Sequence, residues 1–481
     1  MIIVCMEKNL NKDQREQLYA EYGLRILTDN EMRSISQQIP HEIIKRLMVQ
    51  RDSAFPRSFA TFLIPHSNEL AQFEGQKVIA LEVGGTKMRS GLATAKGNTI
   101  DFGDTATTGF LRDDRGSEKK TFTNADDFFD HLLKALPDLP DLLRENPDAA
   151  ISIIFSFPGI PRQVQNGLDA VISSLTKGFS KAGLQGKPFG ELFMDYLFRK
   201  KHIEDKNRRF IIVNDTPVLL TGENNFGAVI GSGYNFAVKI KAKILKEIFE
   251  KNNELFPGQW IFPDGWSDED EMIVNIEAGG FDFAAAILDP NHYGREKTEK
   301  QRFHFLHEVD MQSPEEEHGK QLDEKLVSGQ YLIRSFRVLM QKLADNGYVT
   351  NLNYLQNNKW DSQLISEILT GNWEHIQELN DNDKTFATEI CQKLRELSLQ
   401  VVKSHFIGAM ELNNERYCNA TIEGSVFWNI PGYSRGLQQA LEESGISGDE
   451  ILISKPAIAS DERYGSLGQG AVTALYYFNE S

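Results

Sequence analysis

Cysteine is scarce in this sequence. The 481 residues include only Cys5, Cys391 and Cys418. They lie far apart and form no Cys-x-x-Cys pair, so they are too few and too scattered for a disulfide framework or a zinc site. Cysteine usage this low is typical of a reducing compartment, and we expect a cytoplasmic protein.

Long apolar runs are also missing. No stretch approaches the roughly 18 consecutive apolar residues that are needed to cross a bilayer. The apolar segment Met1 to Met6 is very short and Glu7 follows it directly, so it does not have the apolar centre of a signal peptide. These absences predict a soluble protein without a membrane anchor.

Positive charge is in deficit. The chain has 52 Lys and Arg against 69 Asp and Glu, which gives a formal net charge of −17. This excess argues against nonspecific binding to nucleic acid or to an anionic membrane surface. It leaves room for an anionic nucleotide, because a phosphate site can be built locally from backbone N–H groups and a few cations.

The length and composition indicate an ordinary globular protein with more than one domain. A chain of 481 residues exceeds the size at which a single core stops growing, so two or three domains are expected. The values of 40% hydrophobic and 25% charged residues are close to the average for soluble proteins. They argue against a fibrous or disordered chain, and no short-period repeat is present.

Buried strands alternate with helical stretches along the chain. Apolar runs at Val78–Val83, Ala150–Phe157 and Phe210–Val213 predict strands, and each ends at glycine, at proline or before a polar pair. Helical periodicity lies between them, at Asp126–Leu136 and Phe189–Lys200. This alternation predicts an α/β fold with functional groups at strand ends.

Further helices are predicted near both ends of the chain. The first part, to about Arg51, reads as helical and contains a capping signal at Thr28–Glu31. A long helical period runs from Thr385 to Leu412. The polar segment Lys241–Asp270 reads as a helix followed by an exposed loop.

A glycine pair follows the strand at Val78–Val83. Gly84 and Gly85 let the backbone turn tightly and bring its N–H groups close to a phosphate. The hydroxyl of Thr86 and the cations of Lys87 and Arg89 can add donors. Taken alone, the motif fits an ordinary hairpin at least as well.

Two more strand ends carry polar or glycine residues. Gly231–Asn235 is a second glycine turn after an apolar run, and it too fits either a phosphate loop or a hairpin. Asp215 follows a buried strand, where a carboxylate can accept the proton of an attacking hydroxyl. An N-cap is the alternative role for Asp215. Glu277 and Glu324 have no evident role when they are taken singly.

The order of these pieces resembles the eukaryotic-type hexokinase family, glucokinase included, from about Leu27 to Tyr477. The similar motifs are Leu81–Arg89, Phe155–Pro158, Leu175–Phe179, Val213–Thr216, Gly231–Asn235, Asn275–Glu277, Asp323–Tyr331, Glu423–Ser425 and Gly465–Ala474. Each motif is modest alone, but so many in the family's order form a specific signal.

The resemblance implies a two-domain actin-like ATPase (ribonuclease H-like) fold with a cleft between the domains. The small domain is expected at 68–214 plus 465–481, and the large domain at 1–67 and 215–464. The implied reaction is the transfer of a phosphoryl group from ATP, with Mg²⁺, to the 6-hydroxyl of glucose or a related hexose. The implied assembly is a monomer or a homodimer.

Carried over by position, the family's functional residues fall into three groups. Asp215 is implied as the general base, with Lys177 and Arg89 as catalytic cations. The implied sugar ligands are Ser156, Thr176, Lys177, Asn214, Asp215, Asn235, Glu277 and Glu324. The implied ATP contacts are Glu82, Gly84, Gly85, Thr86, Lys87, Gly231, Ser232, Gly233, Gly329, Gly424 and Ser425. Glu82 is also implied to orient the Mg²⁺ ion through water.

Several positions depart from the family pattern. Glu82 stands in place of Asp, Lys87 in place of Asn, Ser232 in place of Thr, and Ala278 in place of Trp. The longer carboxylate of Glu82 is displaced by roughly 1.5 Å, the length of a C–C bond, and errors of ~1 Å can matter in catalysis. The segment Lys241–Asp270 also looks longer than the family's equivalent.

These departures leave three alternatives to a glucose kinase. One is a catalytically weak sugar sensor or regulatory protein that keeps the hexokinase site. Another is a kinase for a different acceptor, such as mannose, fructose or an amino sugar, since Ala278 lies beside Glu277. The third is a structural actin-like protein, against which the intact sugar-site residues argue.

Overall fold

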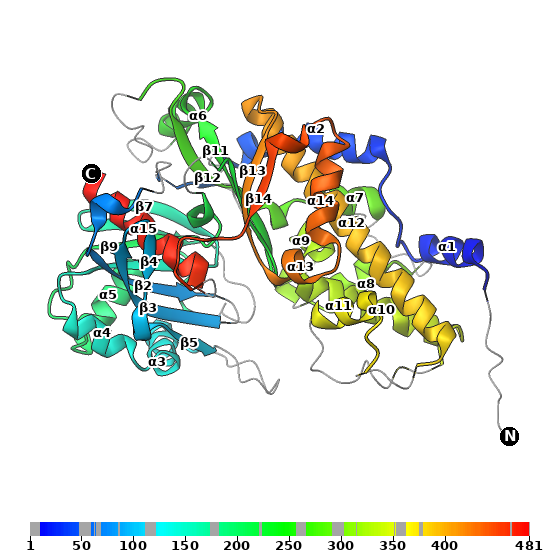
Figure 1. Cartoon of the computed structure of the whole chain (residues 1–481), viewed down its shortest axis with the longest axis horizontal. Coiled ribbons are helices and arrows are strands. Elements are labelled where there is room, and N and C mark those ends of the chain that lie inside the picture. The colour runs from blue at the N-terminus through cyan, green and yellow to red at the C-terminus, as the bar shows by residue number, and fades with distance from the viewer. Residues whose placement is uncertain are drawn as a thin grey trace.

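The protein folds around two β-sheets with helices packed on them. The computed structural model describes residues 10–47, 59–61, 63, 69–84, 87–110, 122–173, 182–220, 224–255, 266–290, 303–313, 315–350, 352, 362–374, 379–461 and 464–480. Figure 1 shows one sheet with its helices on the left, and the other sheet at the centre with a group of helices to its right. The predicted α/β class is confirmed.

The first sheet has eight strands. Their order is β4-β3-β2-β6-β9-β8-β7, with β5 paired to β3. The pairs β2–β6, β6–β9 and β8–β9 are parallel, and the others are antiparallel. The strands are β2 (Lys77–Val83), β3 (Lys87–Lys96), β4 (Thr99–Asp101), β5 (Thr107–Phe110), β6 (Ala150–Phe155), β7 (Gly159–Val164), β8 (Gly167–Ile172) and β9 (Phe210–Val213).

Helices cover both faces of this sheet. Side chains alternate along each strand, so neighbouring residues of β2 enter different cores: Ile79 packs with α3 and α5, and Val78 packs with α15. The helices are α3 (Ala125–Ala135), α4 (Leu139–Glu145), α5 (Phe189–Arg199) and the C-terminal α15 (Gly465–Glu480). Burial on both faces explains the continuous apolar runs of β2, β6 and β9.

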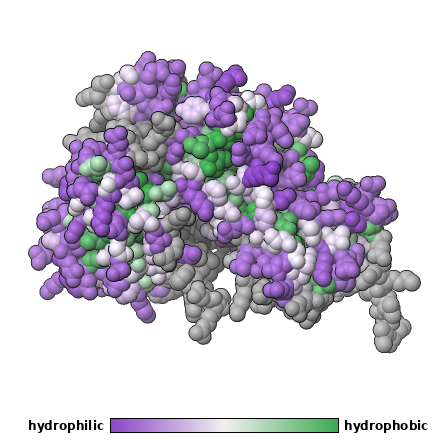
Figure 2. All heavy atoms as spheres, in the orientation of Figure 1, coloured by the Kyte–Doolittle hydropathy of each residue, from purple (hydrophilic) through white to green (hydrophobic). Residues whose placement is uncertain are grey.

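The second sheet has six strands in the order β1-β12-β11-β10-β13-β14. They are β1 (Phe59–Ala60), β10 (Phe226–Ile230), β11 (Tyr234–Lys241), β12 (Glu271–Asn275), β13 (Cys418–Glu423) and β14 (Ile451–Ser454). The strand β14 lies at the edge, where Leu452 is 60% exposed. Hydrophobic spheres gather at this place on an otherwise mostly hydrophilic face (Figure 2).

Most of the remaining helices pack around the second sheet. The long helix α12 crosses this part of the molecule and contacts α2, α9, α10, α11 and α14 (Figure 1). The helices are α1 (Lys12–Glu21), α2 (Asp29–Leu47), α6 (Ala242–Leu255), α7 (Phe283–Leu288), α8 (Phe305–Met311), α9 (Leu322–Val327), α10 (Gly329–Asp345), α11 (Ser362–Thr370), α12 (Asp381–Asn413), α13 (Ser425–Asn429) and α14 (Tyr433–Glu442).

The two sheets share part of a core. Ala237 and Ile273 of the second sheet belong to the same buried cluster as Val213 of β9 and Leu467 of α15. The polypeptide passes from β9 to β10 through the short 3₁₀ helix η4 (Pro217–Leu219), which contacts α15, β10, β11 and β12. The junction that follows Asp215 is therefore packed against both sheets.

The helices predicted at Asp126–Leu136, Phe189–Lys200 and Thr385–Leu412 are confirmed with small changes of boundary. Residues 1–9 and 48–51 of the predicted N-terminal helical region, and residues 256–265 of the predicted loop, lie outside the described residues. The helix α2 follows the expected capping signal, since the Thr28 hydroxyl accepts from Glu31 N–H at 3.3 Å and Glu31 Oε2 accepts from Thr28 N–H at 2.8 Å. The N-terminal region forms two helices, with Gly23 at φ +80° between them. None of the described helices is both long enough and apolar enough to span a membrane. The expected domain boundaries stay a prediction.

Candidate active site

Three parallel strands end together at one edge of the first sheet. The register pairs Val83 with Phe155, and Ile154 with Val213. The residues that follow these strands are consequently neighbours. Ser156 N–H donates to Val83 O at 3.1 Å, and Asn214 Nδ2 donates to Phe155 O at 3.3 Å.

Asp215 lies at this edge and is half-buried. Its Oδ1 accepts from the Thr216 hydroxyl at 3.2 Å, while Asn214 Oδ1 accepts from Thr216 N–H at 3.1 Å. The N-cap residue of η4 is Thr216, so the alternative reading of Asp215 as a helix cap is wrong. The charge of Asp215 acts on Glu277 and Glu423, which belong to the second sheet and its loops.

An ion-pair cluster joins the two sheets beside Asp215. Arg89 of β3 donates through Nη2 to Glu82 Oε1 at 2.7 Å, and the same nitrogen lies 3.4 Å from Glu423 Oε1 at the end of β13. Ser466 at the start of α15 donates to Glu82 Oε2 at 3.2 Å and lies 3.4 Å from Glu423 Oε1. We name Glu82, Arg89, Glu423 and Ser466 the carboxylate–arginine cluster.

Three glycines bring backbone segments together next to this cluster. A side chain on Gly424, at φ +129°, would place its Cβ 2.2 Å from Ile230 O, so only glycine fits there. Gly231 is equally close, since its Cβ would lie 3.1 Å from Gly424 Cα. Gly329 N–H donates to Gly231 O at 2.7 Å. The turns that carry these predicted ATP contacts therefore lie side by side.

Asn275 joins two predicted sugar ligands of the second sheet, Asn235 and Glu277, in a hydrogen-bonded chain. Asn235 Nδ2 donates to Asn275 Oδ1 at 2.8 Å, and Asn275 Nδ2 donates to Glu277 Oε1 at 2.7 Å. Ala278 N–H donates to Asn235 Oδ1 at 3.1 Å. Glu324 completes the group, because its carboxyl group lies next to Gly279 in the loop after Glu277. A Cβ built on Gly279 would lie 3.2 Å from Glu324 Oε2.

Burial perturbs two carboxyl groups of the site. It raises the pKa of Glu277 to about 8. The hydrogen bond from Asn275 lowers this pKa, and the charges of Asp215 and Glu324 raise it further. Burial likewise raises the pKa of Glu423 to about 7, with the charge of Glu82 adding to the effect. Carboxyl groups gathered this closely repel one another, and clusters of perturbed groups are typical of functional sites.

Some predicted residues are not part of these contacts. Gly85, Thr86, Thr176 and Lys177 lie outside the described residues. Lys87 is exposed on β3, and Lys87 O accepts from Gly84 N–H at 3.0 Å to close the β2–β3 turn. The predicted ATP contacts Ser232 and Gly233 close the β10–β11 hairpin, and Ser232 is exposed. Ser425 begins α13 beside Gly231.

Four residues of the site were not predicted as site residues. Glu423 and Ser466 complete the cluster; Glu423 is the last residue of β13 and Glu82 the last but one of β2, so an acidic residue at the end of a strand is a usable signal. Asn275 lay inside a recognised motif but received no role. Arg46 of α2 donates through Nη2 to Gly280 O at 2.7 Å and through Nη1 to Glu277 O at 3.3 Å, and no sequence pattern indicates this contact.

Comparison with known proteins covers most of the chain. Family models described as hexokinase match residues 24–223 and 225–460. The hexokinase of Kluyveromyces lactis is 24% identical over 454 residues, which covers 89% of this chain and 85% of that protein. Hexokinase-2 of Rattus norvegicus is 24% identical and covers 93% of this chain, but the match spans only 45% of the rat protein.

A solved structure has the same fold over nearly the whole chain. The hexokinase from Schistosoma mansoni, complexed with glucose, matches with a TM-score of 0.70 and 18% identity, covering 96% of this chain and 99% of that one. This similarity concerns the fold, and the two adjacent family matches account for residues on both sheets. The chain belongs to the hexokinase family.

Proposed function

We propose that this protein transfers the γ-phosphoryl group of MgATP to the 6-hydroxyl of glucose or a related hexose, with Asp215 as general base. Asp215 accepts the hydroxyl proton as the oxygen attacks phosphorus. The sugar ligands are Ser156, Thr176, Lys177, Asn214, Asn235, Glu277 and Glu324. A carboxyl group can hydrogen-bond to neighbouring hydroxyls in either state, since it accepts when ionised and both donates and accepts when protonated, so such a site discriminates against analogues that lack one.

The position of Asp215 carries this proposal. Its charge acts on Glu277, which lies in the sugar group, and on Glu423, which lies in the carboxylate–arginine cluster. The charge of Asp215 thus acts both on the group that suits hydroxyls and on the cluster beside the turns that suit phosphates. Phosphoryl transfer depends mainly on such positioning and on charge stabilisation.

The residues of the cluster fit a nucleotide with its magnesium ion. Mg²⁺ is usually held by one or two carboxylates together with substrate phosphates and water, and Glu82 and Glu423 supply two carboxylates. Glu82 and Glu423 would hold the ion, which would offset the negative charge of the phosphates, and Arg89 would add a second positive charge.

Phosphorylation of glucose by the purified protein tests the proposal directly. We expect ATP-dependent turnover in the parent and a rate lower by about 10²- to 10⁴-fold in Asp215→Asn, because a general base contributes a factor of that size. Asp449→Asn, at an exposed carboxylate, is the matched control and should keep the parent rate. A parent without turnover on a hexose panel, or an Asp215→Asn variant with the parent rate, would contradict the proposal.

A sugar-binding regulator with little turnover is the second candidate, and one observation favours it. Both oxygens of Glu82 are already engaged, by Arg89 and by Ser466. If these contacts persist with nucleotide bound, Glu82 is not available to orient the metal ion. This candidate predicts sugar binding by calorimetry without turnover, and a gain of turnover in Glu82→Asp, whose shorter side chain withdraws from Arg89.

A further inference from the structure

A buried histidine lies behind the sugar side of the site. His405 is in α12, which carries no predicted sugar ligand, and its side chain is fully buried. Its Nδ1 lies 2.9 Å from the Tyr234 hydroxyl, and its Nε2 lies 3.1 Å from Asp323 Oδ2. Tyr234 and Asp323 are also buried. The three side chains form a hydrogen-bonded chain that has no access to water.

Each partner of His405 adjoins a predicted sugar ligand. Tyr234 directly precedes Asn235 at the start of β11, and Asp323 directly precedes Glu324 in α9. The ring of Phe281, at the end of the loop that begins at Glu277, packs edge-on against His405 with ring centroids 5.1 Å apart. His405 therefore contacts all three segments that carry the sugar ligands of the second sheet.

Asp323 connects two of these segments in a second way. Its backbone N–H donates to Phe281 O at 3.0 Å, and its Oδ1 accepts from Ala285 N–H at 3.2 Å. The two oxygens of the Asp323 carboxylate are thus both hydrogen-bonded, Oδ1 to the backbone of α7 and Oδ2 to His405. A shift of His405 would move α9 and the Glu277 loop together.

The neutral form of His405 satisfies every group in the chain. With its proton on Nε2, the ring donates to the Asp323 carboxylate, and its Nδ1 accepts from the Tyr234 hydroxyl. Burial raises the pKa of Tyr234 well above its ordinary value, so the hydroxyl stays protonated and able to donate. A fully satisfied buried chain of this kind rigidifies the segments that it joins.

We infer that His405 is a positioning residue for hexose recognition, which holds the segments of Asn235, Glu277 and Glu324 at fixed mutual distances. The inference rests on the proposed sugar site. Ligands that contact one small molecule must be held to within about 0.5 Å. Loosening this support should therefore weaken hexose binding more than nucleotide binding, because His405 contacts the sugar-ligand segments directly and the β10–β11 turn only through Tyr234.

Tyr234→Phe removes one hydrogen bond of the chain with little change of volume. We expect the hexose KM and the calorimetric Kd for hexose to rise by about three- to tenfold, the effect of one hydrogen bond. The KM for ATP should stay within twofold of the parent value. Tyr433→Phe is the matched control, because Tyr433 is also fully buried and its hydroxyl bonds to another α12 side chain, Ser398, at 2.6 Å.

Two substitutions of the histidine itself complete the test. His405→Gln keeps an amide that can donate to Asp323, so it should retain more hexose affinity than His405→Leu, which leaves that carboxylate without its side-chain donor. Affinities are compared among folded variants with matched circular dichroism. If His405→Leu does not fold, the Tyr234→Phe and His405→Gln measurements decide.

The outcomes separate this inference from the proposed function. A parent that binds hexose without turnover contradicts the kinase proposal but leaves the Kd comparison valid. An unchanged hexose Kd in Tyr234→Phe, or an equal rise in Tyr433→Phe, overturns the role of His405. A parent that neither binds nor phosphorylates a hexose overturns both.

Discussion

At the scale of single residues, the backbone of Glu277 is unusual. Its φ of +54° lies in the left-handed region, which is energetically costly for any residue other than glycine. Arg46 holds this conformation, because its guanidinium donates to Glu277 O and Gly280 O and lies 4.3 Å from the ring centroid of Phe281. The left-handed turn directs the Glu277 side chain back toward Asn275, where the two form a hydrogen bond.

The carboxyl group of Glu277 makes stability depend on pH. Its pKa rises from 4.5 in the unfolded chain to about 8 in the folded protein, mainly because it is buried. The folded state holds the extra proton between these values, so this contribution to stability is complete below about pH 4.5 and lost as pH rises through 8. We expect the melting temperature of Glu277→Gln minus that of the parent to increase by several degrees as the pH is raised from 5 to 8.

Thermal unfolding monitored by circular dichroism in steps of pH measures this difference. Glu204→Gln, at an exposed glutamate, is the control, and its melting temperature should follow that of the parent at every pH. Parallel pH profiles for the parent and Glu277→Gln would show that the carboxyl group is ionised throughout, and would contradict the prediction.

Site residues at the end of a strand could be predicted from the sequence, whereas site residues whose contacts are distant in sequence could not. The position of Asp215 follows from a local pattern, an apolar strand that stops at a polar pair. His405 gives no such signal, because it reads as one more residue of a long helix. Its contacts with Tyr234 and Asp323 span 171 and 82 residues of sequence, and only tertiary packing brings them together.

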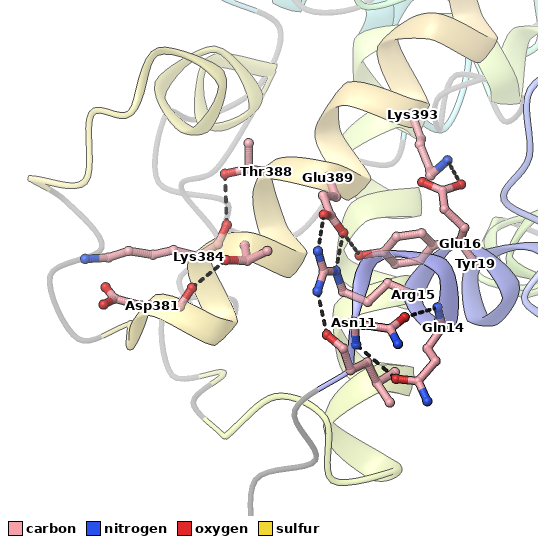
Figure 3. A network of polar contacts seen from close by, with 12 residues as sticks. Asn11, Gln14, Arg15, Glu16, Tyr19, Asp381, Lys384, Thr388, Glu389 and Lys393 are labelled. Atoms are coloured by element: carbon pink, nitrogen blue, oxygen red, sulfur yellow. Dashed lines mark hydrogen bonds and ion pairs between the residues drawn. The ribbon is translucent and has the colours of Figure 1, made fainter.

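At the scale of elements, the polar contacts between helix α1 and α12 centre on one carboxylate. Glu389 accepts from Nε and Nη2 of Arg15, each at 2.7 Å, and from the Tyr19 hydroxyl at 2.8 Å (Figure 3). Lys393, one turn further along α12, pairs with Glu16 and lies over the Tyr19 ring. Most of the polar attachment of α1 in the described structure therefore passes through two neighbouring turns of α12.

Glu389→Gln should loosen α1 without affecting the site. Loss of the charged, two-point bond to Arg15 is expected to lower the free energy of unfolding by about 1–3 kcal/mol. Hydrogen exchange of the α1 amides should become faster, and hexose phosphorylation should be unchanged. Glu396→Gln, on the exposed side of the same helix, is the control. Unchanged exchange in α1 would contradict this account of its attachment.

The elements themselves follow the sequence pattern closely where local and tertiary preferences agree. The strand β9 and the helix α5 begin at the predicted residues because apolar periodicity and their flanking residues coincide. The N-terminal region was predicted as helical throughout. It divides at Gly23, where a side chain would collide with His304, and that close contact cannot be read from local sequence.

At the scale of the whole molecule, the site is divided between the two sheets. Asn214 and Asp215 belong to the strand ends of the first sheet, while Asn235 and Glu277 belong to the second. On the face shown in Figure 2 the molecular surface is notched between the two lobes. We propose that the lobes correspond to the small domain, 68–214 plus 465–481, and the large domain, 1–67 and 215–464.

A hexose that contacts both sets of ligands should draw the lobes together. Water competes with the sugar as a nucleophile, so completing the site only when sugar is bound limits hydrolysis of ATP. We expect the radius of gyration from small-angle scattering to fall when saturating hexose is added. The junction can support such a rotation because η4 and the shared core around Val213 join the lobes on one side.

The same measurement on Glu324→Ala supplies the control, since that variant removes a ligand of one lobe only. The Glu324→Ala variant should need a far higher hexose concentration before its radius of gyration falls. At saturation it should reach the same final radius of gyration as the parent. If calorimetry shows that the parent is saturated with hexose and its scattering curve is unchanged, rotation of the lobes is wrong. The sugar ligands would then act from one sheet, and Asp215 would have to reach the 6-hydroxyl without domain movement.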